Sequence, residues 1–296
     1  MDPAKQVLFD IVYSYQKLPG CRAITLVGSR ARGTSGPKSS VDIMCVYFSE
    51  PDKSQRKEIA KKLSDDPEKI VCYEHPIIMD NFTSHDLKIN VWHVSQDLIC
   101  ERVSTIEKQL RLTNPMLVAS LHECKILWDP KNQLNLWKKQ ISPVPEYYKD
   151  AIIPQIFGEI ISVIKDLSTL EDEESYFYFQ HELIAAIKNI YELIFLLNGQ
   201  YLNLTHSIDS MLGSFEKIPR NVPSKIKMLL LSPCTARGLK QKLRLLCEVT
   251  KLIGDILSEP DKYDITGEME QLCECAPYLF SPTDNADTGT FQTRQS

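Results

Sequence analysis

VGSRARG, at residues 27–33, and SVD, at residues 40–42, form the stretch that decides the fold of this chain of 296 residues. The apolar residues 23–27 predict a strand that runs into a small, flexible turn. A second strand is expected to start near residue 41, with the carboxylate of Asp42 close to its first residue. This layout is typical of a site where turn amides bind phosphate and an acidic residue holds a metal ion.

The turn contains several groups that suit phosphate binding. Gly28 accepts a positive φ and lets phosphate approach the backbone, while Ser29 adds a hydroxyl donor and its own amide. Arg30 and Arg32 place positive charge nearby. We therefore expect Gly28, Ser29, Arg30 and Arg32 to bind a nucleotide phosphate. The alternative is an ordinary strand-to-helix turn whose arginines are solvated.

The strand after the turn carries one acidic residue where a metal site needs several. Positions 40, 42 and 44 share a face because side chains alternate along a strand. Asp42 is acidic, whereas Ser40 and Met44 are neutral. On the predicted strand 86–95, Asn90 is well placed to complete the site, but it is neutral too. We expect Asp42 and Asn90 to hold Mg²⁺ weakly, with Ser40 contacting the nucleotide.

The composition indicates folded domains that carry no overall positive charge. Hydrophobic residues make up 43% of the chain, charged residues 25%, and the net charge is −5. A negative net charge argues against a nucleic-acid partner unless a local patch provides the contact. No apolar run approaches the roughly 20 residues of a membrane span. The first residues lack a signal-peptide pattern, so we expect a cytoplasmic protein with no membrane partner.

The apolar pattern changes near residue 143. Before this point we expect helices at 4–17, 51–65, 96–112 and 115–122, and strands at 22–27, 41–48, 69–73, 86–95 and 125–128. Beyond it, helical spacing predicts helices at 149–167, 175–198, 205–215, 222–232 and 238–258. The fold class expected is α/β (α+β). It comprises a small mixed-sheet domain at 1–142, an all-α helical bundle at 143–280 and a disordered tail at 281–296.

The turn and the acidic strand resemble the signature of the DNA-polymerase-β-like nucleotidyltransferases. That signature is Gly-Ser, often with Ala-Arg-Gly, and then Ser-Asp-x-Asp on the next strand; GSRARG at 28–33 and SSVD at 39–42 match it in part. The resemblance covers residues 20–95 and implies that Asp42 is the second metal-binding carboxylate. Ser40 then replaces the first carboxylate and Asn90 the third. In a second alignment, Asp42 is the first carboxylate and Met44 replaces the second.

The helical half adds to the resemblance. Residues 187–201 look like a helix of bacterial small-molecule, antibiotic-type nucleotidyltransferases, which carry a C-terminal bundle. These relatives imply an acceptor bound between the domains, and Glu182 or Glu192 could supply the general base for its hydroxyl. The alternative for each glutamate is a solvated or ion-paired helix residue. Related bundles often pair, so a homodimer is also implied.

The resemblance implies transfer of a nucleotidyl group, AMP from ATP in the first instance, to a small-molecule or protein hydroxyl, with Mg²⁺ as cofactor. A carboxylate about 4 Å from Mg²⁺ contributes roughly 8 kcal/mol at an effective dielectric near 20, before desolvation. Because about 1.4 kcal/mol changes a rate tenfold, we expect activity to be weakened or lost. A catalytically inactive nucleotide-binding or regulatory protein is the alternative.

Two further interpretations of the missing charge stay open. In the first, the enzyme is active and takes its charge from Asp80, Asp86 or Glu74. In the second, the site has been neutralised to trap a complex. His93 lies on the opposite face of its predicted strand from Asn90, so we do not expect it at the site.

Overall fold

The computed structural model describes residues 3–74, 78–170, 175–204, 208–258 and 262–275. Its backbone contacts divide the chain into two compact units, Met1–Lys149 with Gly199–Leu204, and Asp150–Asn198 with Thr205–Ser296. The domain boundary at residue 143 stays a prediction, and the tail expected at 281–296 lies outside the described residues. Within the described ranges, no helix is both long enough and apolar enough to cross a membrane.

The first unit is built on a six-stranded mixed sheet with the order β3-β4-β5-β2-β1-β6. Its strands are β1 (Cys21–Val27), β2 (Val41–Tyr47), β3 (Val71–Tyr73), β4 (Met79–Ser84), β5 (Leu87–Ser95) and β6 (Lys125–Trp128). β2 and β5 run parallel, and the other neighbouring strands are antiparallel. A mixed sheet combined with helices confirms the fold class expected from the sequence.

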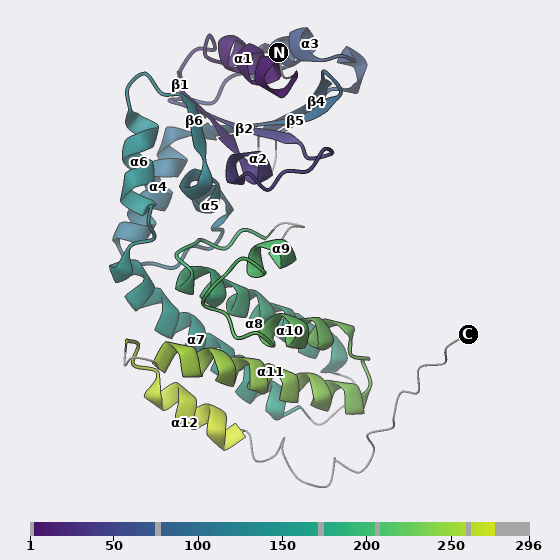
Figure 1. Cartoon of the computed structure of the whole chain (residues 1–296), viewed down its shortest axis with the longest axis vertical. Helices are drawn as coiled ribbons and strands as arrows, with labels where there is room; N and C mark the ends of the chain where they lie inside the picture. Colours follow the sequence, from purple (N-terminus) through teal and green to yellow (C-terminus); the bar gives the residue numbers. More distant parts are fainter. Residues whose placement is uncertain (1–2, 75–77, 171–174, 205–207, 259–261, 276–296) are drawn as a thin grey trace, which may run out of the picture. The chain divides into compact units, whose positions relative to one another are not determined.

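Helices cover both faces of this sheet (Figure 1). One face packs against α1 (Pro3–Tyr15) and α3 (Lys53–Leu63), and the other side carries α2 (Gly28–Arg32), α4 (Gln96–Glu107), α5 (Met116–Glu123) and α6 (Gln133–Ile141). Val7 and Ile11 of α1 belong to the same buried core as Ile43 of β2 and Ile89 of β5. Because strand side chains alternate, Asp42 and Asn90 lie on the opposite face from that core.

The strand β4 is an element that the sequence pattern did not predict. Its sequence is MDNFTS, and Asp80 and Ser84 take buried positions on either side of Phe82. A buried strand is normally recognised by alternating apolar residues. Here two of the three inward positions are polar, so the local pattern is lost.

The second unit is helical throughout its described part. Most of α7 (Glu146–Ser168) belongs to it, followed by α8 (Tyr176–Leu197), α9 (Ile208–Leu212), α10 (Val222–Leu231), α11 (Ala236–Ser258) and α12 (Thr266–Cys275). Ile152, Ile156 and Ile160 recur at four-residue steps along α7 and are fully buried. Gly199 has a φ of 68° and follows the last turn of α8, as expected for a helix that ends at a glycine.

Candidate functional site

The glycine–serine turn folds directly over the carboxylate of Asp42. Gly28 starts α2 immediately after β1 and has a φ of 69°, a conformation that side chains disfavour. A Cβ at this position would lie 2.5 Å from Asp42 Oδ2. Val27 is the register partner of Asp42 across β1 and β2. The turn and the carboxylate therefore lie on the same side of the sheet.

Replacing Gly28 by alanine is expected to destabilise the first unit and displace Asp42. The left-handed conformation disfavours a Cβ by about 1–2 kcal/mol, and the clash with Asp42 adds to this. Gly33→Ala is the matched control, because Gly33 has a φ of 78° but no atom within 4 Å of an added Cβ. Urea unfolding should show the larger loss for Gly28→Ala. Equal losses in the two variants would contradict the close approach.

Two neutral side chains donate hydrogen bonds to one oxygen of Asp42. Ser40 Oγ lies 3.0 Å from Asp42 Oδ1, and Asn90 Nδ2 lies 2.6 Å from the same atom. Asn90 and Asp42 are register partners on the parallel strands β5 and β2. Asn90 thus turns its NH₂ group toward the carboxylate, and its amide oxygen is directed elsewhere. Both donors are thus directed at the same oxygen of the Asp42 carboxylate.

These residues do not fit a magnesium centre. A two-metal site binds each ion through several oxygen ligands, most of them anionic. In the ranges that the structure describes, no group of three or more His, Cys, Asp or Glu side chains could hold a metal ion. Ser40 and Asn90, which the resemblance aligns with carboxylates, act as hydrogen-bond donors to Asp42. Met44, which the second alignment places where the signature has a carboxylate, is fully buried.

The two arginines of the turn have different roles. Arg30 donates from Nε to the carbonyl of Ser40 at 3.0 Å and from Nη2 to the carbonyl of Ser39 at 2.9 Å. It makes no ion pair with any carboxylate in the described part of the chain. Arg32 is instead paired with Glu123, Nη1 to Oε2 at 2.7 Å, and both side chains are largely buried. Glu123 thus compensates the charge of Arg32 within the fold, whereas no described carboxylate pairs with Arg30.

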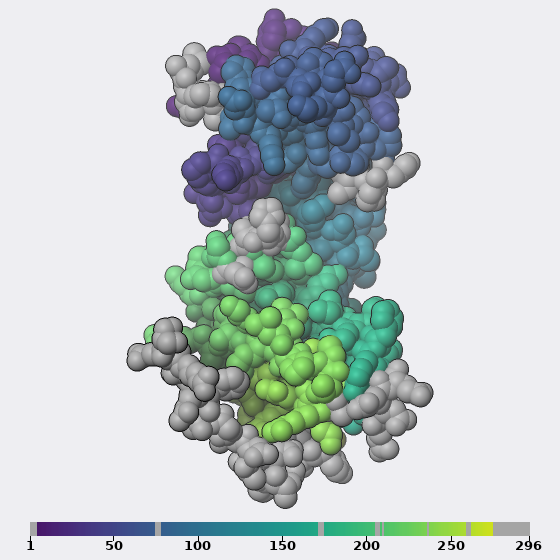
Figure 2. Space-filling model, turned by 90° about the vertical axis from the view of Figure 1, so that its right-hand side faces the viewer, coloured from purple at the N-terminus to yellow at the C-terminus, as the bar shows by residue number. Residues whose placement is uncertain are grey.

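Ser29 presents a hydroxyl group without an internal partner. Its carbonyl accepts a hydrogen bond from the amide of Thr34 at 2.9 Å, which closes the turn. Its side chain is half-buried and makes no hydrogen bond to any other described residue. Residues 34–38, which follow the turn, are exposed at the surface (Figure 2). The turn is thus followed by a loop at the protein surface.

The other carboxylates considered from the sequence lie elsewhere. Asp80 is the register partner of Val91, so it belongs to the face covered by α1 and α3 and not to the face of Asp42. Glu74 is within ion-pair distance of Arg56 and Lys53. Asp86 lies in the turn between β4 and β5, with a φ of 62°. None of these three acids supplies the missing charge beside Asp42.

Residues 15–127 match the family model of the nucleotidyltransferase domain. The chain carries a nucleotidyltransferase domain. A comparison with curated proteins gives no match.

Solved structures similar to the chain include three that concern nucleotides or nucleotidyltransferases. A nucleotidyltransferase-like protein from Exiguobacterium sibiricum 255-15 has a TM-score of 0.45 and 16% identity, over 93% of this chain and 80% of that one. Spectinomycin adenyltransferase from Enterococcus faecialis, with ATP and spectinomycin, has a TM-score of 0.32 and 12% identity, over 92% and 99%. A toxin–antitoxin structure with AMP-PNP has a TM-score of 0.28 and 20% identity, over 50% and 97%. At these scores, the family assignment depends on the domain match.

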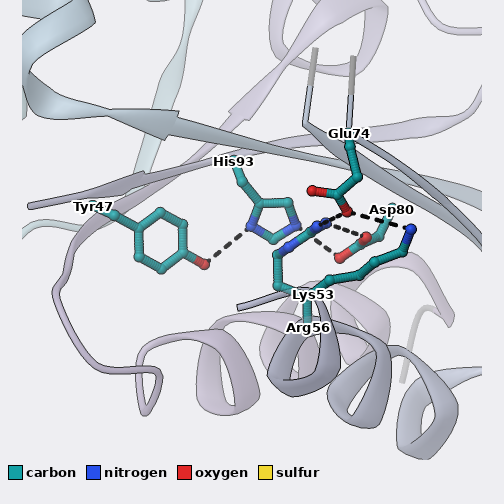
Figure 3. Close-up of polar contacts among 6 residues, drawn as sticks. All are labelled: Tyr47, Lys53, Arg56, Glu74, Asp80 and His93. Carbon is teal, nitrogen blue, oxygen red and sulfur yellow. Dashed lines mark hydrogen bonds and ion pairs between the residues drawn. The ribbon is translucent and has the colours of Figure 1, made fainter. Parts of the chain in front are cut away.

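On the face opposite Asp42, the nucleotidyltransferase domain contains a buried cluster of charges that we call the Arg56 network. Its members come from α3, β2, β4, β5 and the segment after β3, and are Tyr47, Lys53, Arg56, Glu74, Asp80 and His93 (Figure 3). Arg56 Nη1 lies 2.6 Å from Asp80 Oδ1, and Arg56 Nη2 lies 2.5 Å from Glu74 Oε1. The side chains of Arg56 and Asp80 are completely buried.

His93 completes the network on β5. Its Nε2 lies 2.8 Å from Asp80 Oδ2, and its Nδ1 lies 3.3 Å from the Tyr47 hydroxyl. A neutral imidazole satisfies both contacts, because Nε2–H donates to Asp80 and Nδ1 accepts from Tyr47. Burial lowers the pKa of His93, with Arg56 acting in the same direction and the Asp80 contact opposing it. The neutral ring therefore suits this site, on the opposite strand face from Asn90.

Acidification is expected to destabilise the nucleotidyltransferase domain through His93. Its unfolded pKa is about 6.5 and its folded pKa is lower, so the unfolded chain binds the extra proton first. Stability is then lost as pH falls below the unfolded pKa, by up to about 1.4 kcal/mol per pH unit. His93→Gln should reduce this slope in urea unfolding between pH 7 and pH 5. The residual slope includes His122, whose pKa burial also lowers.

The exposed His181 provides the control for this experiment. The loss of slope in His181→Gln should be smaller than the loss in His93→Gln. A slope that is the same in His93→Gln and in the wild type would contradict a neutral, buried His93.

The two candidate bases lie on α8, in the second unit. Glu182 is partly exposed, and its Oε1 lies 3.0 Å from His181 Nδ1. Glu192 is buried, with 5% of its surface exposed. A catalytic role for either glutamate stays a prediction.

Proposed function

We propose that the domain binds a nucleotide through its phosphate at the Gly28–Ser29 turn and has little or no nucleotidyl-transfer activity. The observation that carries this proposal is the pair of neutral donors, Ser40 and Asn90, on one oxygen of Asp42. They occupy the positions where the family resemblance implies metal-binding carboxylates. The phosphate-binding part of the signature is retained, and the acidic part is replaced.

Nucleotide binding is supported by the groups around the turn. Gly28 brings the backbone close to any ligand above Asp42, and the half-buried Ser29 hydroxyl has no partner among the described residues. Arg30 keeps its positive charge beside the turn and fixes the carbonyls of Ser39 and Ser40. A charged donor and a hydroxyl on a glycine turn are groups that bind phosphate.

Weak or absent transfer follows from the chemistry of the reaction. Nucleotidyl transfer depends on positioning the triphosphate and on compensating the charge that develops during attack on the α-phosphorus. When metal ions supply that compensation, the carboxylates that hold them are indispensable. At about 4 Å, the attraction between two unit charges is roughly 4 kcal/mol at an effective dielectric near 20. Because two of the carboxylates are replaced by neutral side chains, we expect the rate of transfer to fall by several orders of magnitude.

A second candidate function is transfer of AMP from ATP to a hydroxyl of a small molecule or protein. The match of residues 15–127 to the nucleotidyltransferase domain favours it. It would require Mg²⁺ held by Asp42 with Asn90 turned to present its oxygen, and a base such as Glu182 or Glu192. Turning Asn90 would break its 2.6 Å hydrogen bond to Asp42.

Two measurements on the full-length protein separate the candidates. A nucleotide should raise the unfolding temperature of the protein, because a ligand that binds only the folded state stabilises it. Release of pyrophosphate from ATP, with Mg²⁺ and a panel of hydroxyl acceptors, should stay at background. Binding without turnover supports the first function, whereas turnover at ordinary enzymatic rates would establish the second.

A further inference from the structure

We infer that the site binds the phosphate of its nucleotide without a divalent cation. This inference rests on the proposed nucleotide binding and states how the phosphate is recognised. The ligand class is a free nucleotide anion, and Arg30 takes over part of the charge compensation that metal ions would otherwise provide.

The carboxylate of Asp42 is already held by hydrogen bonds within the protein. A cation that approaches Asp42 must compete with two hydrogen bonds to Oδ1, from Ser40 at 3.0 Å and from Asn90 at 2.6 Å. The other oxygen, Oδ2, lies against Gly28, where even an added Cβ would come within 2.5 Å. Both oxygens of Asp42 are thus engaged or confined by the protein itself.

The balance of charge at the turn also favours a phosphate that carries no metal ion. Three carboxylates at a site repel a phosphate strongly unless cations intervene. Here Asp42 is the acid beside the turn, and the three other candidate acids are held elsewhere, as shown for Asp80 and Glu74 in Figure 3. Arg30 is nearby and unpaired with any described carboxylate. One positive and one negative charge leave the site close to neutral, so a bare phosphate can approach.

The side chain of Arg30 is held in one orientation beside the turn. Its Nε and Nη2 are used to hold the carbonyls of Ser40 and Ser39. These two contacts fix the guanidinium plane, and Nη1 makes no hydrogen bond to the rest of the described chain. A pre-oriented guanidinium donates to phosphate with little loss of side-chain freedom on binding.

Isothermal titration calorimetry of the full-length protein tests the inference directly. The probes are the four ribonucleoside monophosphates and the corresponding triphosphates, each in EDTA and in excess Mg²⁺. Triphosphates chelate Mg²⁺ much more strongly than monophosphates, so the two sets separate an effect on the ligand from an effect on the site. We expect at least one nucleotide to bind in EDTA, with Mg²⁺ tightening its affinity by less than about threefold.

The possible outcomes separate this inference from the proposed function. Binding that is unaffected or weakened by Mg²⁺ supports both. Binding that Mg²⁺ tightens by more than about threefold, or that requires Mg²⁺, overturns metal-free recognition and leaves nucleotide binding intact. No binding of any probe under either condition overturns the proposed function itself.

Variants of Arg30 test the source of the compensating charge. Arg30→Gln should weaken nucleotide binding in EDTA by about tenfold or more, since hydrogen bonds to charged groups are the stronger kind. Arg30→Lys, which keeps the charge, should bind with intermediate affinity. The matched control is Lys38→Gln, which removes one charge from an exposed position of the adjoining loop and should change affinity less than about twofold.

Wild-type affinity in Arg30→Gln would overturn the role of Arg30. Unfolding of each variant without nucleotide checks that the fold is retained. If Arg30→Gln does not fold, Arg30→Lys decides: reduced affinity in EDTA supports the role, and wild-type affinity overturns it.

Discussion

Replacing Ser40 and Asn90 together by aspartate is expected to create a divalent-cation site at Asp42. Each substitution exchanges a neutral donor for a carboxylate at the position that now contacts Asp42 Oδ1. Attraction between a carboxylate and a divalent ion about 4 Å apart is roughly 8 kcal/mol at an effective dielectric near 20, and desolvation offsets part of it. Binding of Mn²⁺, measured by calorimetry, should tighten by at least about 100-fold, or 2.7 kcal/mol.

The same double variant should lose stability without metal and regain it with metal. Three neighbouring carboxylates repel one another until a cation compensates them. The control is the double variant Ser54→Asp and Gln55→Glu, which adds two negative charges at exposed positions of α3. It should bind Mn²⁺ no better than the wild type. Unchanged Mn²⁺ affinity in the Ser40 and Asn90 variant would refute the alignment of these positions with metal ligands.

Removing the buried guanidinium of Arg56 is expected to have the largest effect on stability. Arg56→Met keeps much of the side-chain volume but leaves Asp80, whose side chain is fully buried, without its cation. Breaking one half of a buried ion pair typically costs about 3–5 kcal/mol. Chemical unfolding of the full-length protein should show a loss of that order. Glu74, which is 40% exposed, can turn to solvent and should contribute little to the loss.

Two further variants make this result specific to the charge pair. Lys57→Met, on the exposed side of the same helix, should change stability by less than about 0.5 kcal/mol. Adding Asp80→Asn to Arg56→Met removes the uncompensated charge and should recover part of the loss. A loss below about 1 kcal/mol in Arg56→Met, or no recovery in the double variant, would contradict a buried ion pair.

The contacts of the candidate site could be predicted where they are local in the sequence. The turn at Gly28 and the acid at Asp42 are fixed by the end of one strand and the start of the next. Strand alternation then brings Asn90 to the same face. The hydrogen bonds of Arg30 join it to Ser39 and Ser40, which lie nine and ten residues further along the chain, so one short motif contains all three residues.

The contacts that the sequence pattern could not predict join residues that lie far apart in the chain. Arg32 and Glu123 are 91 residues apart, and nothing near either one indicates the other. Arg56 lies in the lysine-rich helix α3, whose polar sequence does not indicate a buried residue, and its partner Asp80 lies on β4, where two of the three inward positions are polar. Each half of that ion pair looks like a surface residue until the sheet brings the two together.

The glycine turn of this chain matches the signature more fully than the acidic strand does. Replacing two carboxylates does not leave Asp42 as an isolated charge, because Ser40 and Asn90 donate hydrogen bonds to it. The turn above it keeps Gly28 in the left-handed conformation. The turn and the positions that the resemblance aligns with carboxylates are thus separate parts of the site.

A crystal structure of the full-length protein with a bound nucleotide, grown in Mn²⁺, tests the central claim most directly, since anomalous scattering locates the metal. We expect phosphate oxygens within hydrogen-bonding distance of Ser29 Oγ and Arg30, and no anomalous peak at Asp42. A manganese ion bound to Asp42, or a nucleotide seated away from the Gly28–Ser29 turn, would contradict it.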